Sequence, residues 1–561
     1  MRPAPAPLGR LDRLRRFGYA GAPPHTDVRE RLVPPFPRPA TRPWLLLGLG
    51  PDRAGRLARA TEWLGPLLVA VLAGVLRFWH LGRPRDLVFD ETYYAKDAWA
   101  LLHLGYEGTW PDRTIADPRI LAHPQVISLS DAGSFVAHPP TGKWLIAVGE
   151  LLFGLDPVGW RFMTALLGTL SVFMLCRIGR RLFRSTFLGC LAGALMAIDG
   201  LHLVMSRTAL LDLVVMFFVL AAFGCLLIDR DRARARLAAA LPADPEGRVR
   251  PDAHTGDRAG TGRRPWRLTA GVLLGLAAST KWNGLYVLVF FVVLTLLWDV
   301  GARRVAGASR PYRAVLRRDL LGSVLSLVPT AVLTYLVTWT GWFLSDDGWG
   351  RHWADGRGGT WSWIPAPLRS FWHYEYLVYQ FNVNLHSPHK YQSNPWSWLV
   401  LGRPVLFAYN SPEPGQDGCS TATACTRTVL ALGTPVLWWS ACFALAYLLY
   451  RWALRRDWRA GAILCGVAAG YLPWFLYQDR TVFSFYAVVF VPYLCLAVAM
   501  MLGAVLGPPG ADRRRRTRGA VAAGTLVLLI AWNFVYFYPI YTGQTIPYSS
   551  WQARMWLDTW I

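Results

Sequence analysis

Long apolar stretches dominate the chain, and they lack the polar positions that a soluble helix needs on its outer face. Residues 285–300 and 521–541 contain almost no charged side chains. A helix that crosses a bilayer needs about 20 predominantly apolar residues. The pattern predicts an all-α polytopic membrane protein with about eleven transmembrane helices. The expected spans are 63–79, 160–182, 185–204, 208–228, 267–282, 284–300, 319–343, 428–450, 460–477, 482–506 and 519–541.

The segments between the spans alternate in character. One set is rich in arginine, and the other is rich in tryptophan and tyrosine and less densely basic. Basic loops stay on the cytoplasmic side, and Trp and Tyr mark membrane interfaces. The N-terminus is therefore expected in the cytoplasm and the C-terminus outside. The cytoplasmic set is 1–59, 177–184, 230–267, 303–318, 451–459 and 513–518. The outer set is 80–159, 205–207, 283, 344–427, 478–481 and 542–561.

Composition agrees with this topology. The 561 residues are 53% hydrophobic and 17% charged, and 59 Lys and Arg against 35 Asp and Glu give a net charge of +24. Most of this charge is explained by membrane orientation. Nucleic-acid binding is disfavoured, because basic and stacking aromatic residues are expected on opposite faces of the membrane.

The same pattern suggests four regions. Residues 1–60 are predicted to form a disordered basic cytoplasmic tail. Residues 61–343 form an N-terminal membrane core whose first outer loop, 80–159, carries the candidate chemistry. Residues 344–427 form a second outer loop, and 428–561 form the C-terminal membrane helices. The stretch 231–266 resembles a flexible cytoplasmic loop.

Six of the eight cysteines lie inside predicted spans and are interpreted as packing residues. Cys419 and Cys425 lie in the second outer loop. In an oxidising compartment they form a small disulfide, and otherwise they are two free thiols. The sequence leaves both alternatives open.

The first outer loop carries adjacent carboxylates, Asp90-Glu91, directly after the first span. A structural alternative is that Asp90 is the N-cap of a short helix that starts at Glu91. The loop ends with His138-Pro139-Pro140 and Lys143, and an apolar stretch to residue 153 predicts a helix along the outer interface. Lys143 either extends to water or contacts a lipid phosphate.

Further ionisable residues lie at the outer edge of the membrane, namely Arg207, Asp212, Lys281 and Arg480. Charges at such positions are costly and suggest function. A structural Arg207–Asp212 pair is the alternative. The spacing His386-x-x-His389 is a weak metal motif, because no regular ligand set accompanies it.

Together these groups suit a transferase with a lipid-phosphate donor. A carboxylate can act as a general base for a hydroxyl acceptor. Cations can hold the phosphate and neutralise the charge that develops on the leaving group. Aromatic side chains can line a site for a sugar ring.

From about residue 63 to the end, the chain resembles the protein O-mannosyltransferases, specifically the actinobacterial polyprenol-phosphate-mannose type. The motifs that carry the resemblance occur in order on the expected outer side. They are Asp90-Glu91, His138-Pro139-Pro140-x-Gly142-Lys143, Ser206-Arg207 with Asp212, Lys281-Trp282-x-Gly284, Tyr391-x-Ser393-x-Pro395-Trp396 with Arg403-Pro404, and Arg480-Thr481-x-Phe483-x-Phe485-Tyr486.

The resemblance implies an eleven-span membrane glycosyltransferase (GT-C) fold in the plasma membrane, with an extracytoplasmic active site and interfacial helices in its first outer loop. The donor is expected to be polyprenyl-phosphate-mannose. The acceptor is expected to be a Ser or Thr hydroxyl of an exported protein near the export channel, and membrane lipid is a further partner. Transfer would be a direct, inverting displacement. No metal is expected to be obligatory, although a divalent cation near the carboxylate pair is compatible with the sequence.

Site roles also follow from the resemblance. Asp90 would deprotonate the acceptor, and Glu91 would position the acceptor or Asp90. The expected donor-phosphate contacts are Lys143, Arg207, Lys281 and Arg480. The expected supporting residues are His138, Asp212, Tyr391 and Trp396.

Three other functions compete with this interpretation. The same architecture could glycosylate a lipid or a cell-wall glycan. A polyprenyl-lipid transporter or flippase would spread charges through the bilayer and show matching halves, which the sequence lacks. A non-catalytic partner subunit is disfavoured by the intact set of carboxylates and cations.

Overall fold

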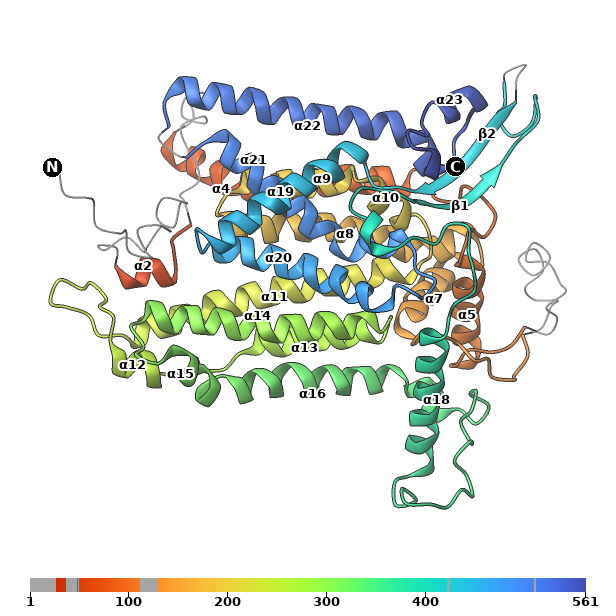
Figure 1. The fold of residues 1–561 in the computed structure, drawn as a ribbon, viewed down its shortest axis with the longest axis horizontal. Helices are drawn as coiled ribbons and strands as arrows, with labels where there is room; N and C mark the ends of the chain where they lie inside the picture. The colour runs from red at the N-terminus through yellow and green to blue at the C-terminus, as the bar shows by residue number, and fades with distance from the viewer. Residues whose placement is uncertain (1–26, 37–47, 49, 111–128, 421–423, 509–510) are drawn as a thin grey trace, which may run out of the picture.

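The computed structural model describes residues 27–36, 48, 50–110, 129–420, 424–508 and 511–561. Long helices lie side by side in a bundle, short helices lie at both of its ends, and a small sheet lies at one of them (Figure 1). The predicted tail is described only in part, and parts of both predicted outer loops, 111–128 and 421–423, lie outside the described residues.

A helix or a broken helical run coincides with each of the eleven predicted spans. In chain order these are α4 (Pro51–Phe78), α8 (Pro157–Phe183), α9 (Thr186–Ala197) with α10 (Gly200–Ser206), α11 (Leu211–Ala240), α13 (Pro265–Ala278), α14 (Asn283–Val305), α16 (Leu320–Thr338), α19 (Pro435–Ala453), α20 (Trp458–Tyr471) with η2 (Leu472–Tyr477), η3 (Ser484–Phe490) with α21 (Val491–Leu506), and α22 (Arg513–Thr542).

Within the described part of the chain, eight of these runs are long and apolar enough to cross a membrane, and the bent pair α9–α10 makes nine. The other two are α13, with only 14 residues, and α19. The membrane-embedded helical fold is therefore confirmed, and the count of eleven spans stays a prediction.

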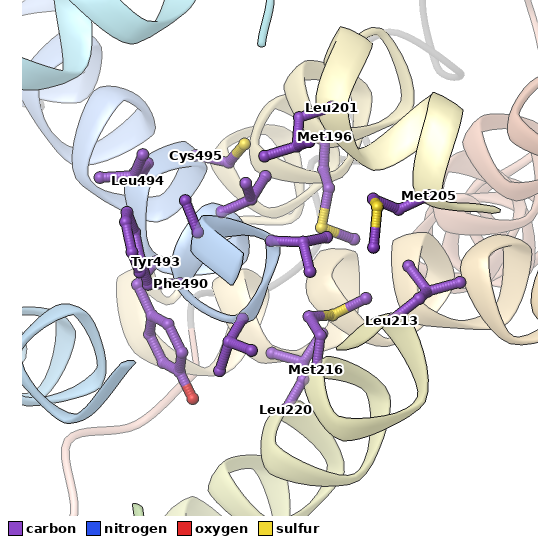
Figure 2. Packing of buried hydrophobic residues seen from close by; sticks show 14 of the residues in the cluster. Met196, Leu201, Met205, Leu213, Met216, Leu220, Phe490, Tyr493, Leu494 and Cys495 are labelled. Atoms are coloured by element: carbon purple, nitrogen blue, oxygen red, sulfur yellow. The ribbon is translucent and has the colours of Figure 1, made fainter. Parts of the chain in front are cut away.

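The α9–α10 break is stabilised by a buried aspartate. Asp199 caps α10 by accepting the backbone N–H of His202 at 2.9 Å, and it also accepts the indole N–H of Trp438 at 2.7 Å. Around the break, α9 packs against α21, and α10 packs against α11 (Figure 2). The side chains labelled there are Met196, Leu201, Met205, Leu213, Met216, Leu220, Phe490, Tyr493, Leu494 and Cys495. This packing fixes the start of α11, which carries Asp212.

The short helices α2 (Val28–Leu32), α12 (Ala253–Arg258) and α15 (Pro311–Arg318) lie at one end of the bundle (Figure 1). The stretch 231–266, predicted to be a flexible loop, is instead structured: α11 continues to Ala240 and α12 follows. Its packing explains why, because Leu237, Ala238 and Leu241 are buried in a cluster with Val28 and Leu32 of α2.

The other end of the bundle carries the predicted outer segments (Figure 1). Its helices are α5 (Glu91–Leu104), α7 (Thr141–Phe153), α17 (Thr340–Leu344), α18 (Ala366–Val383), η1 (Pro395–Ser397), α23 (Tyr548–Gln552) and η4 (Asp558–Trp560). Helix α7 starts directly after Pro139-Pro140, as predicted. Its residues Leu151 and Leu152 are exposed, so one apolar face is available to lipid.

A three-stranded antiparallel sheet, absent from the sequence prediction, lies at this end. Strands β1 (Val405–Asn410), β2 (Cys425–Ala431) and β3 (Thr545–Pro547) pair in the order β1-β2-β3, with Val405 opposite Ala431 and Cys425 opposite Pro547. A disulfide joins Cys419 and Cys425, which settles the alternative left open by the sequence.

Candidate active site

Asp90 stands at the N-cap position of α5, as the structural alternative proposed, but its carboxylate makes no capping hydrogen bond. The preceding residue, Phe89, has a left-handed backbone with φ of 50°, which is unfavourable for a bulky side chain. Its ring is held against Phe407 at 4.9 Å, Phe485 at 5.5 Å and Phe483 at 5.7 Å between centroids. Aromatic packing thus holds a strained turn that leaves the Asp90 carboxylate available for chemistry.

The surroundings of Asp90 tune its basicity. Burial raises the pKa of this carboxyl from 3.8 to about 6, the positive charge of Lys281 opposes the rise, and Asp212 adds to it. A carboxylate with a pKa of about 6 is still ionised at neutral pH. It is also a stronger base than an exposed aspartate, as a general base requires.

Glu91 is fully buried and has a different role from Asp90. Its two oxygens accept hydrogen bonds from Arg161 at 2.8 and 2.7 Å and from the backbone N–H groups of Val88 and Ala209, each at 2.9 Å. The same guanidinium donates to the carbonyl of Asp86. Of the two predicted roles for Glu91, this geometry favours positioning of Asp90. Both oxygens of Glu91 are thus already hydrogen-bonded within the protein.

Lys281 and Asp212 form a second buried pair next to Asp90. The Lys281 Nζ atom donates to both Asp212 oxygens at 3.0 Å and lies 4.2 Å from the centre of the Tyr486 ring. The Arg207–Asp212 pair considered above does not form. Lys281 therefore has its cation fixed beside the candidate base.

Three predicted residues, His138, Lys281 and Arg480, line one cavity. Arg480 donates through Nη2 to Asn382 at 3.1 Å, and its buried Nε has no hydrogen-bond partner among the described residues. Burial, together with the nearby cations, lowers the pKa of His138 well below its usual value, so this imidazole is neutral. The cavity thus combines a neutral imidazole with two cations that can face an anion.

A larger apolar cavity of about 620 Å³ adjoins the first, and Trp282 and Tyr379 line both. It lies between α13, α14, α16 and α18 and carries one carboxyl, Glu375. Burial raises the pKa of Glu375 to about 7, and its carboxylate accepts a hydrogen bond from Tyr335 at 2.7 Å. The smaller cavity is therefore polar, and the larger cavity beside it is apolar.

The structure does not bring Lys143 and Arg207 to this cavity. Lys143 is buried on α7, 2.5 Å from Glu107 and 3.8 Å from Asp97, so it reaches neither water nor headgroups. Arg207 donates to four carbonyls at the end of α4, including that of Trp79 at 2.7 Å. Neither residue lines either cavity, and the contact of each with the donor phosphate stays a prediction.

Tyr391 and Trp396 also lie outside the lining of either cavity. Tyr391 is buried, with the guanidinium of Arg403 5.3 Å from its ring centre. Trp396 is 71% exposed and donates its indole N–H to Gln478 at 3.1 Å. Their supporting role stays a prediction. In the described residues, no group of three His, Cys, Asp or Glu is close enough to hold a metal ion.

Sequence reasoning missed two residues that build the site, Arg161 and Asn382. Arg161 is an arginine at the outer start of a predicted span, and that position was a usable signal. Asn382 carried no signal in the sequence.

Comparisons with known proteins identify the family of the chain. Residues 67–239 match the family model "Dolichyl-phosphate-mannose-protein mannosyltransferase", and residues 367–560 match "C-terminal four TMM region of protein-O-mannosyltransferase". The polyprenol-phosphate-mannose–protein mannosyltransferase of Mycolicibacterium smegmatis is 41% identical over 521 residues, covering 91% of this chain and 95% of that protein. Its namesake in Corynebacterium glutamicum is 34% identical over 508 residues, covering 88% and 92%.

Among solved structures, the Saccharomyces cerevisiae Pmt1–Pmt2 complex bound to the sugar donor is similar, with a TM-score of 0.65. It shares 16% sequence identity, and the match covers 89% of this chain and 93% of that one. This likeness confirms the predicted membrane glycosyltransferase fold.

Proposed function

Because the chain belongs to the family of actinobacterial polyprenol-phosphate-mannose–protein mannosyltransferases, we propose that it transfers mannose from polyprenyl-phosphate-mannose to Ser or Thr hydroxyls of proteins. One observation carries the proposal. The positive charge of Lys281 acts on the partly buried Asp90 carboxylate. Lys281 and Arg480 also line a polar cavity that adjoins an apolar one. A base, an anion site and a lipid site are what such a reaction needs.

The donor lipid is divided between the two cavities. The phosphate lies near Lys281 and Arg480, and the prenyl chain enters the apolar cavity between α14, α16 and α18. The aromatic lining and the volume of about 620 Å³ suit a chain of isoprene units. Trp282 and Tyr379, shared by both cavities, mark the boundary between head and tail.

The reaction is a single displacement at the anomeric carbon. Asp90 takes the proton of the acceptor hydroxyl as its oxygen bonds to that carbon, and the bond from the carbon to the phosphate oxygen breaks. The leaving group is polyprenyl phosphate with one additional negative charge. Lys281 and Arg480 stabilise this charge as it develops. Attack opposite the leaving group inverts the configuration of the sugar, and Asp90 then releases its proton.

No step of this sequence requires a metal, and we propose that none is obligatory. The leaving phosphate is a stable anion, and two cations already face it. Glu91 positions Asp90 without contacting the substrate, since its pairing with Arg161 stabilises the turn that carries Asp90.

The charge pattern supports an orientation with the N-terminus in the cytoplasm and the site outside the plasma membrane, where exported proteins are the acceptors. Exposed positions at the two ends of the bundle test it. Cysteine at Ser411 should react with a membrane-impermeant maleimide in intact cells, whereas cysteine at Glu246 should react only after permeabilisation. The reverse labelling pattern would refute the orientation.

The function is tested with the purified chain in nanodiscs, supplied with radiolabelled polyprenyl-phosphate-mannose and a Thr-containing peptide. Wild type should label the peptide, and Asp90→Asn should lose about 10²- to 10⁴-fold in kcat. Asp131→Asn, an exposed aspartate of the same outer segment, is the matched control and should keep full activity. Full activity of Asp90→Asn would exclude it as the base, and labelling of lipid or glycan alone would identify a different acceptor class.

A further inference from the structure

A second polar cleft lies between the segment that precedes Asp90 in the chain and the small sheet. It has a volume of about 250 Å³. One wall is the segment Pro84–Val88, directly before Phe89-Asp90, and the other is the β1–β2 ladder. The ladder residues are Phe407, Ala408, Tyr409, Asn410, Arg427, Thr428 and Val429. None of the donor-site residues described above belongs to this lining.

Hydrogen bonds and aromatic contacts connect both walls of the cleft to the turn that carries Asp90. Arg161 donates to the Pro84 carbonyl at 2.6 Å and to the Asp86 carbonyl at 2.9 Å, and it also holds Glu91. On the other wall, Phe407 packs against the Phe89 ring, 4.9 Å between centroids. Both walls are therefore fixed to the turn that carries Asp90, so an occupant of the cleft has a defined position relative to the base.

The lining chemistry differs from that of the lipid cavity. It contains a carboxylate, Asp86, a guanidinium, Arg427, a carboxamide, Asn410, and the phenol of Tyr409. Tyr409 is 50% exposed, and Asp86 and Asn410 are exposed as well, so water reaches the cleft. Hydrogen-bonding groups of both kinds and of both charges suit a polypeptide, whereas a prenyl chain would leave them unpaired.

We propose that this cleft binds the acceptor polypeptide, as an extended segment next to the Ser or Thr that enters the site. The proposal rests on the proposed function. The donor approaches from the side of Lys281 and α14, and the acceptor approaches from the side of β1 and β2. Asp90, between Phe89 and Glu91, is held by the packing on both sides and receives the hydroxyl.

The test fills the cleft. Ala408→Trp places an indole between the two walls and should raise the KM for a Thr-containing peptide by about tenfold or more, since misfit of this size costs at least about 1.4 kcal/mol. The KM for polyprenyl-phosphate-mannose should stay within about twofold. Glu413→Trp adds the same bulk at an exposed position beyond the cleft and is the matched control. An unchanged peptide KM in an active Ala408→Trp enzyme would overturn the proposal.

A second measurement does not depend on how Ala408→Trp folds. A photocrosslinking amino acid replaces the half-exposed Tyr409 in the full chain, and a labelled Thr peptide is added in nanodiscs. If excess unlabelled peptide suppresses the crosslinking, the cleft is supported as the acceptor site. Absence of crosslinking in a variant that still transfers mannose refutes it. If the wild type transfers no mannose to peptide, the proposed function fails instead, so the two failures are distinguishable.

Discussion

Neutralising Glu91 separates a positioning role from a direct role in the reaction. The side chain is 0% exposed, as is its partner Arg161. In Glu91→Gln, one carboxylate oxygen becomes an NH₂ group. Whichever oxygen is replaced, that NH₂ faces two N–H donors, one from Arg161 and one from the backbone of Val88 or Ala209.

The magnitude follows from this geometry. Leaving one partner of a buried ion pair uncompensated costs about 3–5 kcal/mol. Two donor-to-donor contacts, at about 1–3 kcal/mol each, give a similar range. With an unfolding entropy of about 2.1 cal/mol/K per residue, 4 kcal/mol lowers the Tm of a 561-residue chain by about 3–4 °C.

The assay compares Glu91→Gln with Asp90→Asn, its neighbour and matched carboxyl-to-amide change. Thermal unfolding of both variants is followed by scanning fluorimetry in one detergent, and mannose transfer is measured in parallel. Glu91→Gln should lose stability and part of its activity, because the turn before α5 loosens. Asp90→Asn should lose activity with an unchanged or higher Tm, because burial already disfavours its charge.

A specific result refutes this reasoning. If Glu91→Gln keeps the wild-type Tm but loses as much kcat as Asp90→Asn, Glu91 acts on substrate and its pairing with Arg161 is incidental. Arg161→Met is the reciprocal variant, and it should destabilise the chain by a similar amount, since it leaves the Glu91 charge buried and unpaired.

Three further predictions concern the rest of the site. The kcat/KM for mannose transfer should rise with pH through about 6 and level off above it, because Asp90, with its raised pKa, must be deprotonated to act; a rate that falls over this range would contradict the assignment. Lys281→Met should raise the KM for the lipid donor and lower kcat, by about tenfold or more in kcat/KM, and should leave the KM for peptide unchanged. Replacing Cys419 and Cys425 with serine should destabilise the end of the molecule that carries the β1–β2–β3 sheet by about 2 kcal/mol, while donor binding is retained. Loss of donor affinity would show instead that the β1–β2 hairpin supports the lipid site.

The sequence by itself determined the features that depend on neighbours along the chain. Apolar stretches predicted the helices of the bundle, because a bilayer imposes length and hydrophobicity on every span. The start of α7 after Pro139-Pro140 was also predictable, since it depends on local backbone preferences.

Only the tertiary structure decided which charges pair. Lys143, Arg207 and Lys281 have similar sequence signatures at the outer edge. Lys143 pairs with Glu107, Arg207 caps the end of α4, and Lys281 pairs with Asp212 beside the cavity. A buried cation binds whichever carboxylate or carbonyl the fold places within reach, and for Arg207 those carbonyls lie more than 125 residues away in the sequence. Local pattern therefore located the functional end of the molecule, and long-range packing decided which charged residues were left to face a substrate.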